Sequence, residues 1–287
     1  MMVKEITVLS GKGGTGKTSV AASLAVLTQR TVMTDCDVDA PDLHLLLKPE
    51  VLETQELKAS RVAVIDEEKC VQCGKCEEHC RFGAIEKLII DPILCEGCGV
   101  CAYICPVAAI ELEKRVSGYA FISKTKYGPM SHALLNPGEE NSGKLVTLVR
   151  QNAKKVAEKE NCKVIINDGP PGIGCPVIAS LGGVGMGLIV AEPTLSGIHD
   201  MERALGLLNH FNITSLVCVN KYDINEENTA RIVEFCKSHG VEIVGKIPFD
   251  IVVTEAMVAE KPVVEYSPKS SVSKAIVELW KKILRIT

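Results

Sequence analysis

The stretch that decides the fold of this chain lies near its N-terminus and reads Gly11-Lys12-Gly13-Gly14-Thr15-Gly16-Lys17-Thr18. It follows an apolar run over 6–9 and opens onto a helical pattern over 19–27. The spacing matches G-x-x-x-x-G-K-[ST], in which glycines allow a tight turn whose amide groups point inward. The following helix N-terminus adds positive potential. Strand, loop and helix together predict a phosphate-binding loop, and a glycine-rich turn without a ligand is the alternative.

Residues of this loop and carboxylates that follow two later strands predict a Mg²⁺–nucleotide site. Lys17 can reach the β- and γ-phosphates, and the Thr18 hydroxyl can hold Mg²⁺. A short strand over 31–34 ends in a carboxylate cluster of Asp35, Asp37 and Asp39, which suits Mg²⁺ and the attacking water. A buried-type strand over 162–167 ends at Asp168, which we expect to bind Mg²⁺ directly or through water.

The loop also carries a second lysine, and Lys12-Gly13-Gly14-Thr15-Gly16-Lys17-Thr18 matches K-G-G-x-G-K-[ST] in full. This pattern resembles the deviant Walker A ATPases, which include MinD, ParA, the Mrp iron–sulfur carriers and the nitrogenase iron protein. The resemblance implies ATP hydrolysis by a dimer in which Lys12 reaches the partner's nucleotide. It also implies that Asp37 positions the attacking water. Gly172, in a stretch similar to the Mrp switch II, is the implied γ-phosphate sensor.

The base of the nucleotide is expected at two further loops. Asn220 follows an apolar strand over 215–219 and can hydrogen-bond a purine edge, as the equivalent residue does in the resembled family. The string Asn220-Lys221-Tyr222-Asp223 also resembles the guanine-reading motif of GTPases, so GTP is the alternative to the favoured ATP. A later segment resembles the part of MinD that packs on the base, which makes Pro248 and Asp250 candidate contacts.

Composition restricts the remaining classes. The chain has 287 residues, 46% of them hydrophobic and 24% charged, and a net charge of −4. It therefore lacks the overall basic field that recruits nucleic acid. No apolar run approaches the roughly 20 residues of a membrane helix, so we expect a cytoplasmic protein. The amphipathic pattern over 271–285 fits a helix packed on the sheet better than a membrane-targeting helix.

Thirteen cysteines are present, and eight of them form two copies of C-x₂-C-x₂-C-x₃-C. This is the spacing of bacterial ferredoxins with two [4Fe–4S] clusters, in which the fourth cysteine of each motif binds the other cluster. The predicted ligand sets are Cys70, Cys73, Cys76 and Cys105 for one cluster, and Cys95, Cys98, Cys101 and Cys80 for the other. Paired zinc sites are the alternative.

The other five cysteines carry weaker signals. Cys175 lies at the offset of a cluster ligand in the nitrogenase iron protein, but a plain thiol is the better interpretation because no second cysteine matches. The remaining four lie in or beside apolar runs and read as small core residues: Cys36, Cys162, Cys218 and Cys236.

Alternating strands and helices predict an α/β fold with a doubly wound, mostly parallel sheet. We assign 1–59 and 116–287 to a P-loop ATPase domain, and 60–115 to an inserted α+β ferredoxin-type domain. The leading hypothesis is a dimeric ATPase that couples ATP to electron transfer, as a homodimer or with a paralogue, toward an unidentified redox or metalloprotein partner. The alternatives are a carrier for iron–sulfur or metal centres, and a MinD/ParA-like positioning ATPase with structural clusters.

Overall fold

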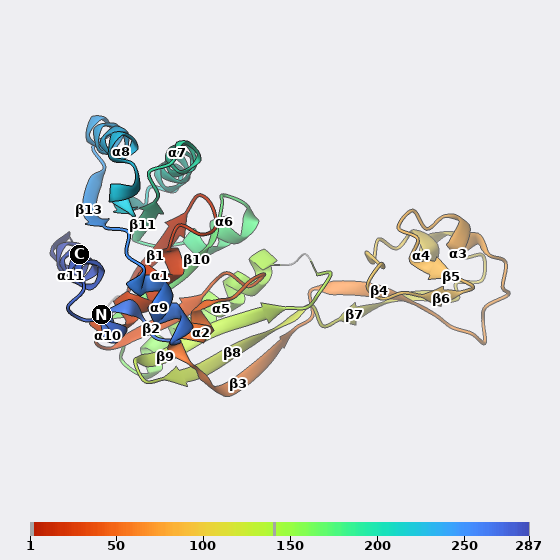
Figure 1. The fold of residues 1–287 in the computed structure, drawn as a ribbon. Coiled ribbons are helices and arrows are strands. Elements are labelled where there is room, and N and C mark those ends of the chain that lie inside the picture. Colours follow the sequence, from red (N-terminus) through yellow and green to blue (C-terminus); the bar gives the residue numbers. More distant parts are fainter. Residues whose placement is uncertain (1–2, 140–141, 287) are drawn as a thin grey trace.

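A computed structural model describes residues 3–139 and 142–286, and its main body is built on a nine-stranded sheet (Figure 1). The strand order is β13-β12-β11-β1-β10-β2-β9-β8-β3. All strands from β13 to β9 in this order run parallel. They are β1 (Lys4–Ser10), β2 (Thr31–Asp35), β9 (Gly128–Leu135), β10 (Val164–Pro171), β11 (Met186–Ala191), β12 (Thr214–Asn220) and β13 (Glu242–Ile247). The mostly parallel α/β fold predicted from the sequence is confirmed.

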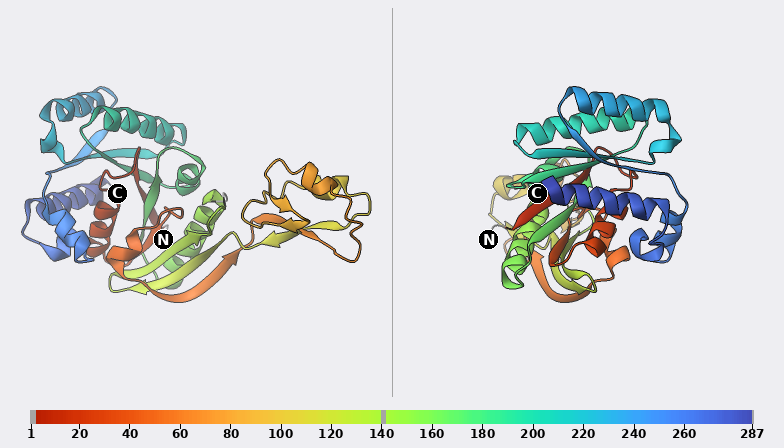
Figure 2. Two further views of the ribbon diagram at one scale, coloured as in Figure 1. Left: turned by 45° about the vertical axis from the view of Figure 1, so that its right-hand side comes forward. Right: turned by 90° about the vertical axis from the view of Figure 1, so that its left-hand side faces the viewer.

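Helices cover both faces of the sheet (Figure 2). One face carries α1 (Lys17–Leu27), α2 (Leu43–Leu47), α9 (Val252–Val258), α10 (Val263–Tyr266) and α11 (Ser271–Ile286). The other carries α5 (Ser142–Lys159), α6 (Cys175–Leu181), α7 (Leu195–His210) and α8 (Glu226–Ser238), with a 3₁₀ turn, Tyr222–Ile224, before α8. Side-chain alternation along β1 serves both layers, because Ile6 and Val8 pack on the α1 side and Leu9 packs on the α6 side.

The sheet ends in an antiparallel extension that the sequence did not reveal in full. β8 (Gly118–Thr125) forms a hairpin with β9, and β3 (Glu50–Leu57) pairs outside β8. Most β3 side chains are exposed, so this edge strand has neither an apolar run nor a buried face to mark it. The chain leaves the main body at the end of β3 and returns at the start of β8.

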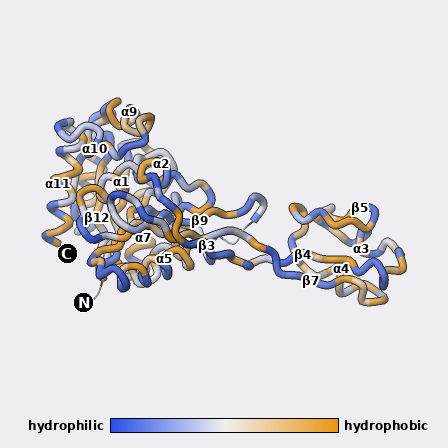
Figure 3. Tube along the Cα trace, turned by 90° about the horizontal axis from the view of Figure 1, so that it is seen from below, coloured by the Kyte–Doolittle hydropathy of each residue, from blue (hydrophilic) through white to orange (hydrophobic). Residues whose placement is uncertain are grey.

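Residues between these two points form a separate lobe that projects from the sheet edge (Figure 1). Its elements are β4 (Ser60–Ile65), α3 (Lys75–Glu78), β5 (Ile85–Glu86), β6 (Ile89–Ile90), α4 (Val100–Ile104) and β7 (Ile110–Arg115). The strands form the antiparallel pairs β4–β7 and β5–β6. Hydrophobic and hydrophilic segments alternate along the lobe (Figure 3), and its buried cluster holds only Ala63, Cys76, Ile85 and Ile110. A core this small rarely stabilises a unit without a metal or a disulfide.

The C-terminal helix α11 packs on the sheet, as predicted. Val272, Ile276 and Leu279 are buried in the core, and Gly245 of β13 leaves room for Leu279. Within the described residues, no helix is long and apolar enough to cross a membrane. The prediction of small core cysteines is also confirmed, because the side chains it named are all buried: Cys36, Cys162, Cys218 and Cys236.

Candidate functional site

The glycine-rich loop lies at the carboxyl edge of the parallel strands, between β1 and α1. Gly16 has φ of +88° and sits so close to Asn220 that a Cβ atom there would lie 2.4 Å from Asn220 Nδ2. Asn220 Nδ2 donates a hydrogen bond to the Thr15 carbonyl oxygen at 2.7 Å. The left-handed turn and the close approach both require glycine. Asn220, predicted as a purine contact, therefore also holds the loop in place.

Lys17 and Asp168 form a buried ion pair at the centre of this loop. Lys17 Nζ lies 2.7 Å from Asp168 Oδ1 and 3.4 Å from Thr18 Oγ1, so the predicted phosphate and Mg²⁺ residues are brought together. Burial opposes the charge on Lys17, but the carboxylates, chiefly Asp168, outweigh burial and raise its pKa. In this arrangement the Lys17 ammonium group can bind a phosphate anion, and the Asp168 carboxylate can bind a divalent cation.

A further carboxylate, Asp35, lies beside this pair, and the sequence predicted it only as one member of the carboxylate cluster. It lies opposite Asp168 in the β2–β10 ladder. Its oxygens accept hydrogen bonds from the amides of Asp37 at 3.1 Å and Leu43 at 3.0 Å, so it shapes the segment that carries Asp37. Burial, then the charge of Asp168, raise the pKa of Asp35 well above its usual value. Asp37 itself is half-buried, and burial raises its pKa as well.

Lys12 is held within its own chain. Its Nζ lies 3.2 Å from Glu192 Oε2 and 3.3 Å from Thr194 Oγ1. The same Glu192 accepts from Lys221 Nζ at 2.8 Å. Burial by itself would raise the pKa of the Glu192 carboxyl. Hydrogen bonds from Lys221 and Lys12 outweigh burial, so the pKa of Glu192 is lowered overall. Sequence reasoning missed Glu192, whose only signal was its position at the end of the strand over 187–191.

The other predicted base and sensor residues lie in loops at the same edge, and Gly172 and Asp250 each make a structural hydrogen bond there. Gly172 donates its amide hydrogen to the Ser10 carbonyl at 3.0 Å. Asp250 Oδ1 accepts from the Val252 amide at 3.0 Å and so supports the start of α9, while Pro248 follows directly after β13. Asp223 Oδ1 accepts from the Phe249 amide at 2.7 Å and holds the loop after Pro248.

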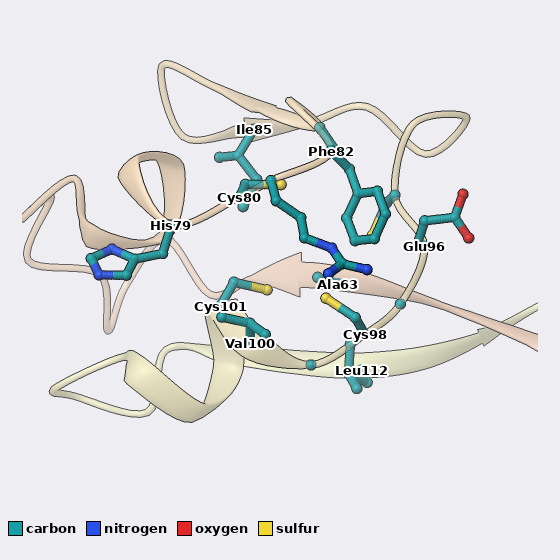
Figure 4. Close-up of a pocket in the computed structure, with 15 residues that line it drawn as sticks. Ala63, His79, Cys80, Phe82, Ile85, Glu96, Cys98, Val100, Cys101 and Leu112 are labelled. Atoms are coloured by element: carbon teal, nitrogen blue, oxygen red, sulfur yellow. The ribbon is translucent and has the colours of Figure 1, made fainter.

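The lobe contains a cavity bounded by the four cysteines of one predicted set. About 290 Å³ in volume, it is lined by Cys80, Cys95, Cys98 and Cys101. Cys80 approaches from one side, and Cys98 and Cys101 approach from the other (Figure 4). A Cβ at Gly97 would lie only 2.3 Å from the Arg61 carbonyl, so the loop of Cys95 and Cys98 packs directly on β4. The cysteine from the first motif thus meets three from the second.

The other predicted set borders a second, smaller cavity. Cys70, Cys73, Cys76 and Cys105 line it, and its volume is about 20 Å³. The two halves of the lobe repeat the same local geometry. Gly74 and Gly99 both adopt left-handed conformations immediately before α3 and α4. The amide of Cys70 donates to the Asp66 carbonyl, and that of Cys95 donates to the Asp91 carbonyl.

The donor chemistry distinguishes the metal groups that these cavities could hold. Among the described residues, no three His, Cys, Asp or Glu side chains converge closely enough to hold a single metal ion. The thiols instead surround a space, and the larger cavity is mostly apolar, with Ala63, Ile85 and Leu112 in its wall. Four thiolates around an apolar space fit a cubane better than one tetrahedral zinc ion.

A phosphate-binding loop at the carboxyl edge of a parallel sheet, with a buried lysine–aspartate pair behind it, defines a P-loop nucleotide-binding protein. Comparison with known families agrees. The chain belongs to the CobQ/CobB/MinD/ParA nucleotide-binding family, whose model matches residues 6–263.

Similar proteins cover most or nearly all of the chain. Uncharacterized protein MJ0578 of Methanocaldococcus jannaschii is 37% identical, covering 98% of this chain and 97% of its own. Uncharacterized protein MJ0579 of the same organism is 31% identical and covers 79% of this chain and 82% of its own. An iron–sulfur cluster carrier protein of Aquifex aeolicus is 25% identical, covering 98% of this chain and 67% of its own. The Mg-ADP complex of the septum site-determining protein MinD from Pyrococcus horikoshii shares the fold. Its TM-score is 0.61 at 18% identity, with 99% of this chain and 97% of that chain covered.

Proposed function

We propose that this protein is a dimeric ATPase that uses ATP binding and hydrolysis to control electron transfer through two [4Fe–4S] clusters to a partner protein. One observation carries the proposal. A P-loop nucleotide site and two cavities, each bounded by four cysteines, belong to one chain, and the lobe that holds the cavities is inserted between strands β3 and β8 of the sheet that carries the P-loop. Thiolate-bound cubanes supply one-electron transfer.

The loop residues fit a nucleotide. Thr15 Oγ1 is the buried side-chain polar atom that has no hydrogen-bond partner among the described residues, and it lies in the phosphate-binding loop. Lys17 binds the phosphates, and Thr18 and Asp168 hold Mg²⁺. Binding then separates Lys17 from Asp168, because each gains a partner of opposite charge. Asp37 lies on the segment that Asp35 holds and is placed to orient the attacking water. Asn220, Pro248 and Asp250 face the base, and Gly172 gives up its bond to Ser10 to contact the γ-phosphate.

Dimer formation follows from the position of Lys12. This lysine forms an ion pair with Glu192 of its own chain, and its side chain is 32% exposed. Release from Glu192 frees its ammonium group for the nucleotide of a second subunit. The second subunit is another copy or a paralogue, and Methanocaldococcus jannaschii has two proteins similar to this chain.

The cysteine sets assign the cluster ligands. We place one cluster on Cys80, Cys95, Cys98 and Cys101. The other takes the cysteines around the smaller cavity, where the side chains must move apart to accept a cubane: Cys70, Cys73, Cys76 and Cys105. In this proposal the lobe is a ferredoxin-type domain over 60–115, inserted into an ATPase domain formed by 1–59 and 116–287.

Anaerobic purification tests the proposal directly. We expect about eight irons and eight sulfides per chain, and two centres that dithionite reduces. The electron paramagnetic resonance spectrum and the reoxidation rate should change when Mg-ATP is added. Stoichiometric zinc in place of iron would contradict the presence of the clusters. A reoxidation rate that is the same with and without Mg-ATP would contradict nucleotide-controlled electron transfer.

A cluster-carrier function is the second candidate, because a relative over nearly the whole chain is named an iron–sulfur cluster carrier. A carrier releases its cluster to an acceptor, so incubation with an apo-ferredoxin should deplete iron from this protein in a nucleotide-dependent way. Retention of all iron during repeated redox cycles favours electron transfer. A positioning ATPase instead requires nucleotide-dependent binding to lipid vesicles or DNA.

A further inference from the structure

One arginine at the base of the lobe has three partners, one of which lies in the main body. Arg115, the last residue of β7, pairs with Glu139 through an Nη2–Oε1 distance of 2.6 Å. Its Nε donates to Ser60 Oγ at 3.4 Å, and its Nη1 donates to the Pro92 carbonyl. A guanidinium group can serve three directions at once because its five donors form a rigid planar fork.

Each partner of Arg115 belongs to a different part of the molecule. Glu139 lies in the segment that follows β9 of the main sheet, and its carboxylate is only 3% exposed. Pro92 lies three residues before Cys95, whose amide is anchored to the Asp91 carbonyl. Ser60 begins β4 at the point where the chain enters the lobe. Arg115 therefore ties the loop that leads to Cys95 to the main body.

The segment that holds Glu139 also touches the nucleotide site. The amide of Leu135 donates to the Val38 carbonyl at 3.1 Å, and Val38 directly follows Asp37. Asn136 then donates its amide to the Ser117 carbonyl and its side-chain Nδ2 to the Val116 carbonyl, each at 2.9 Å. These contacts connect the Asp37 segment to the base of the lobe through a few hydrogen bonds.

The junction below Arg115 is itself well ordered by hydrogen bonds. Ser117 is fully buried, and its Oγ accepts from the amides of Ala59 at 3.1 Å and Ser60 at 3.0 Å. The strand pairs β3–β8 and β4–β7 meet at this serine. The main body and the lobe are therefore joined by hydrogen-bonded strands rather than by a loose linker.

From these contacts we propose that Arg115 is a positioning residue that couples the Asp37–Val38 segment to the cavity of Cys95. When nucleotide displaces the backbone at Val38, Leu135 and Glu139 move with it. Arg115 then shifts the 92–98 loop, which changes the surroundings and exposure of the cysteines there. The identity of the group in that cavity rests on the proposed function, whereas the mechanical link does not.

Hydrogen–deuterium exchange of the full, anaerobically purified chain tests this link. We expect Mg-ATP and Mg-ADP to give different exchange at 36–40 and at 90–99. In Arg115→Gln, the difference at 36–40 persists and the difference at 90–99 is lost. Arg115→Lys behaves like Arg115→Gln, because one ammonium group cannot span the three partners. If the reduced centres are present, the nucleotide-dependent change in their electron paramagnetic resonance spectrum is lost in parallel.

The matched control is Arg61→Gln. Arg61 lines the same cavity at the base of the lobe as Arg115 and Glu139. The Arg61→Gln substitution therefore removes one positive charge from the same region and leaves the three contacts of Arg115 intact. It should retain the wild-type difference at 90–99. Glu139→Gln gives a second reading if Arg115→Gln does not fold.

The inference is overturned if Arg115→Gln and Glu139→Gln retain the wild-type nucleotide effect at 90–99, or if the wild-type chain shows none there. Its failure is distinguishable from that of the proposed function. A protein without reducible iron refutes electron transfer, whereas exchange at 90–99 still reports on Arg115.

Discussion

Lys17 Nζ and Asp168 Oδ1 lie 2.7 Å apart, with side-chain exposures of 8% and 1%, so the two side chains form a buried ion pair. Removing one partner leaves a buried charge uncompensated, which typically costs about 3–5 kcal/mol. We expect Lys17→Met to abolish ATP binding and to lower the free energy of unfolding by roughly 3 kcal/mol. Isothermal titration with Mg-ATP and urea unfolding measure the two effects. Unchanged ATP affinity would exclude Lys17 from the phosphate site.

Lys12 provides the comparison for Lys17, because its pairing with Glu192 is far more exposed. A partly exposed ion pair contributes about 0–1 kcal/mol, so Lys12→Gln should leave stability and ATP binding close to wild type. It should abolish ATP-dependent dimerisation and hydrolysis. Analytical ultracentrifugation with a slowly hydrolysed ATP analogue measures the dimer. A Lys12→Gln protein that still dimerises and hydrolyses ATP would remove the cross-subunit role.

Asp223 decides between two interpretations of the base site. Its Oδ1 already accepts the Phe249 amide, so it is placed to hold the loop after Pro248 rather than to read guanine. We expect Asp223→Ala to weaken ATP and GTP binding by a similar factor of about 3–10, which corresponds to loss of one hydrogen bond of about 1 kcal/mol. Competition with a fluorescent nucleotide measures both. Selective loss of GTP binding would identify a guanine reader.

The crossed cysteine sets predict which substitutions act together. Cys80→Ala and Cys98→Ala should each lower the iron content from about eight to about four, and the double variant should stay near four. Cys80→Ala combined with Cys73→Ala should lose nearly all iron. Cys175→Ala is the control, because this exposed cysteine lies outside both cavities. Additive loss in the Cys80–Cys98 double variant would show that the two belong to different centres.

His132 predicts an acid-sensitive contribution to stability. Burial lowers the pKa of His132 to about 4, and His44 adds to the effect. Between about 4 and the ordinary value near 6.5, the unfolded chain binds the extra proton and the folded chain does not, so stability falls as the pH drops through this window. Replacing His132 by Gln should reduce this acid-induced loss in the free energy of unfolding by about 1–3 kcal/mol. Urea unfolding from pH 7 to about 4 measures it, with exposed His210→Gln as the control. Equal pH dependence in wild type and His132→Gln would contradict the assignment.

Motifs whose residues lie close together in the chain were predictable from the sequence. The loop over 11–18 owes its shape to glycines and to the adjoining helix, both of which are local properties. The grouping of the cysteines was predictable in the same way, because short spacing keeps three thiols of each motif close together and the duplicated motif indicates a fourth from the other half. In the structure, the four cysteines of each predicted set line one cavity.

Only the tertiary structure decided the contacts between segments far apart in the chain. Glu192 meets Lys12 across 180 positions, so no local pattern marks this pair, and the place of Asp35 opposite Asp168 depends on the pairing of two strands far apart in the chain. Arg115, Glu139 and Pro92 are ordinary surface residue types whose significance depends on the strand pairing at the base of the lobe. Spacing along the chain therefore determined which chemical groups this protein carries. The packing of the sheet and lobe decided which charges hold them in place, because ion pairs and hydrogen bonds depend on distances that the fold alone sets.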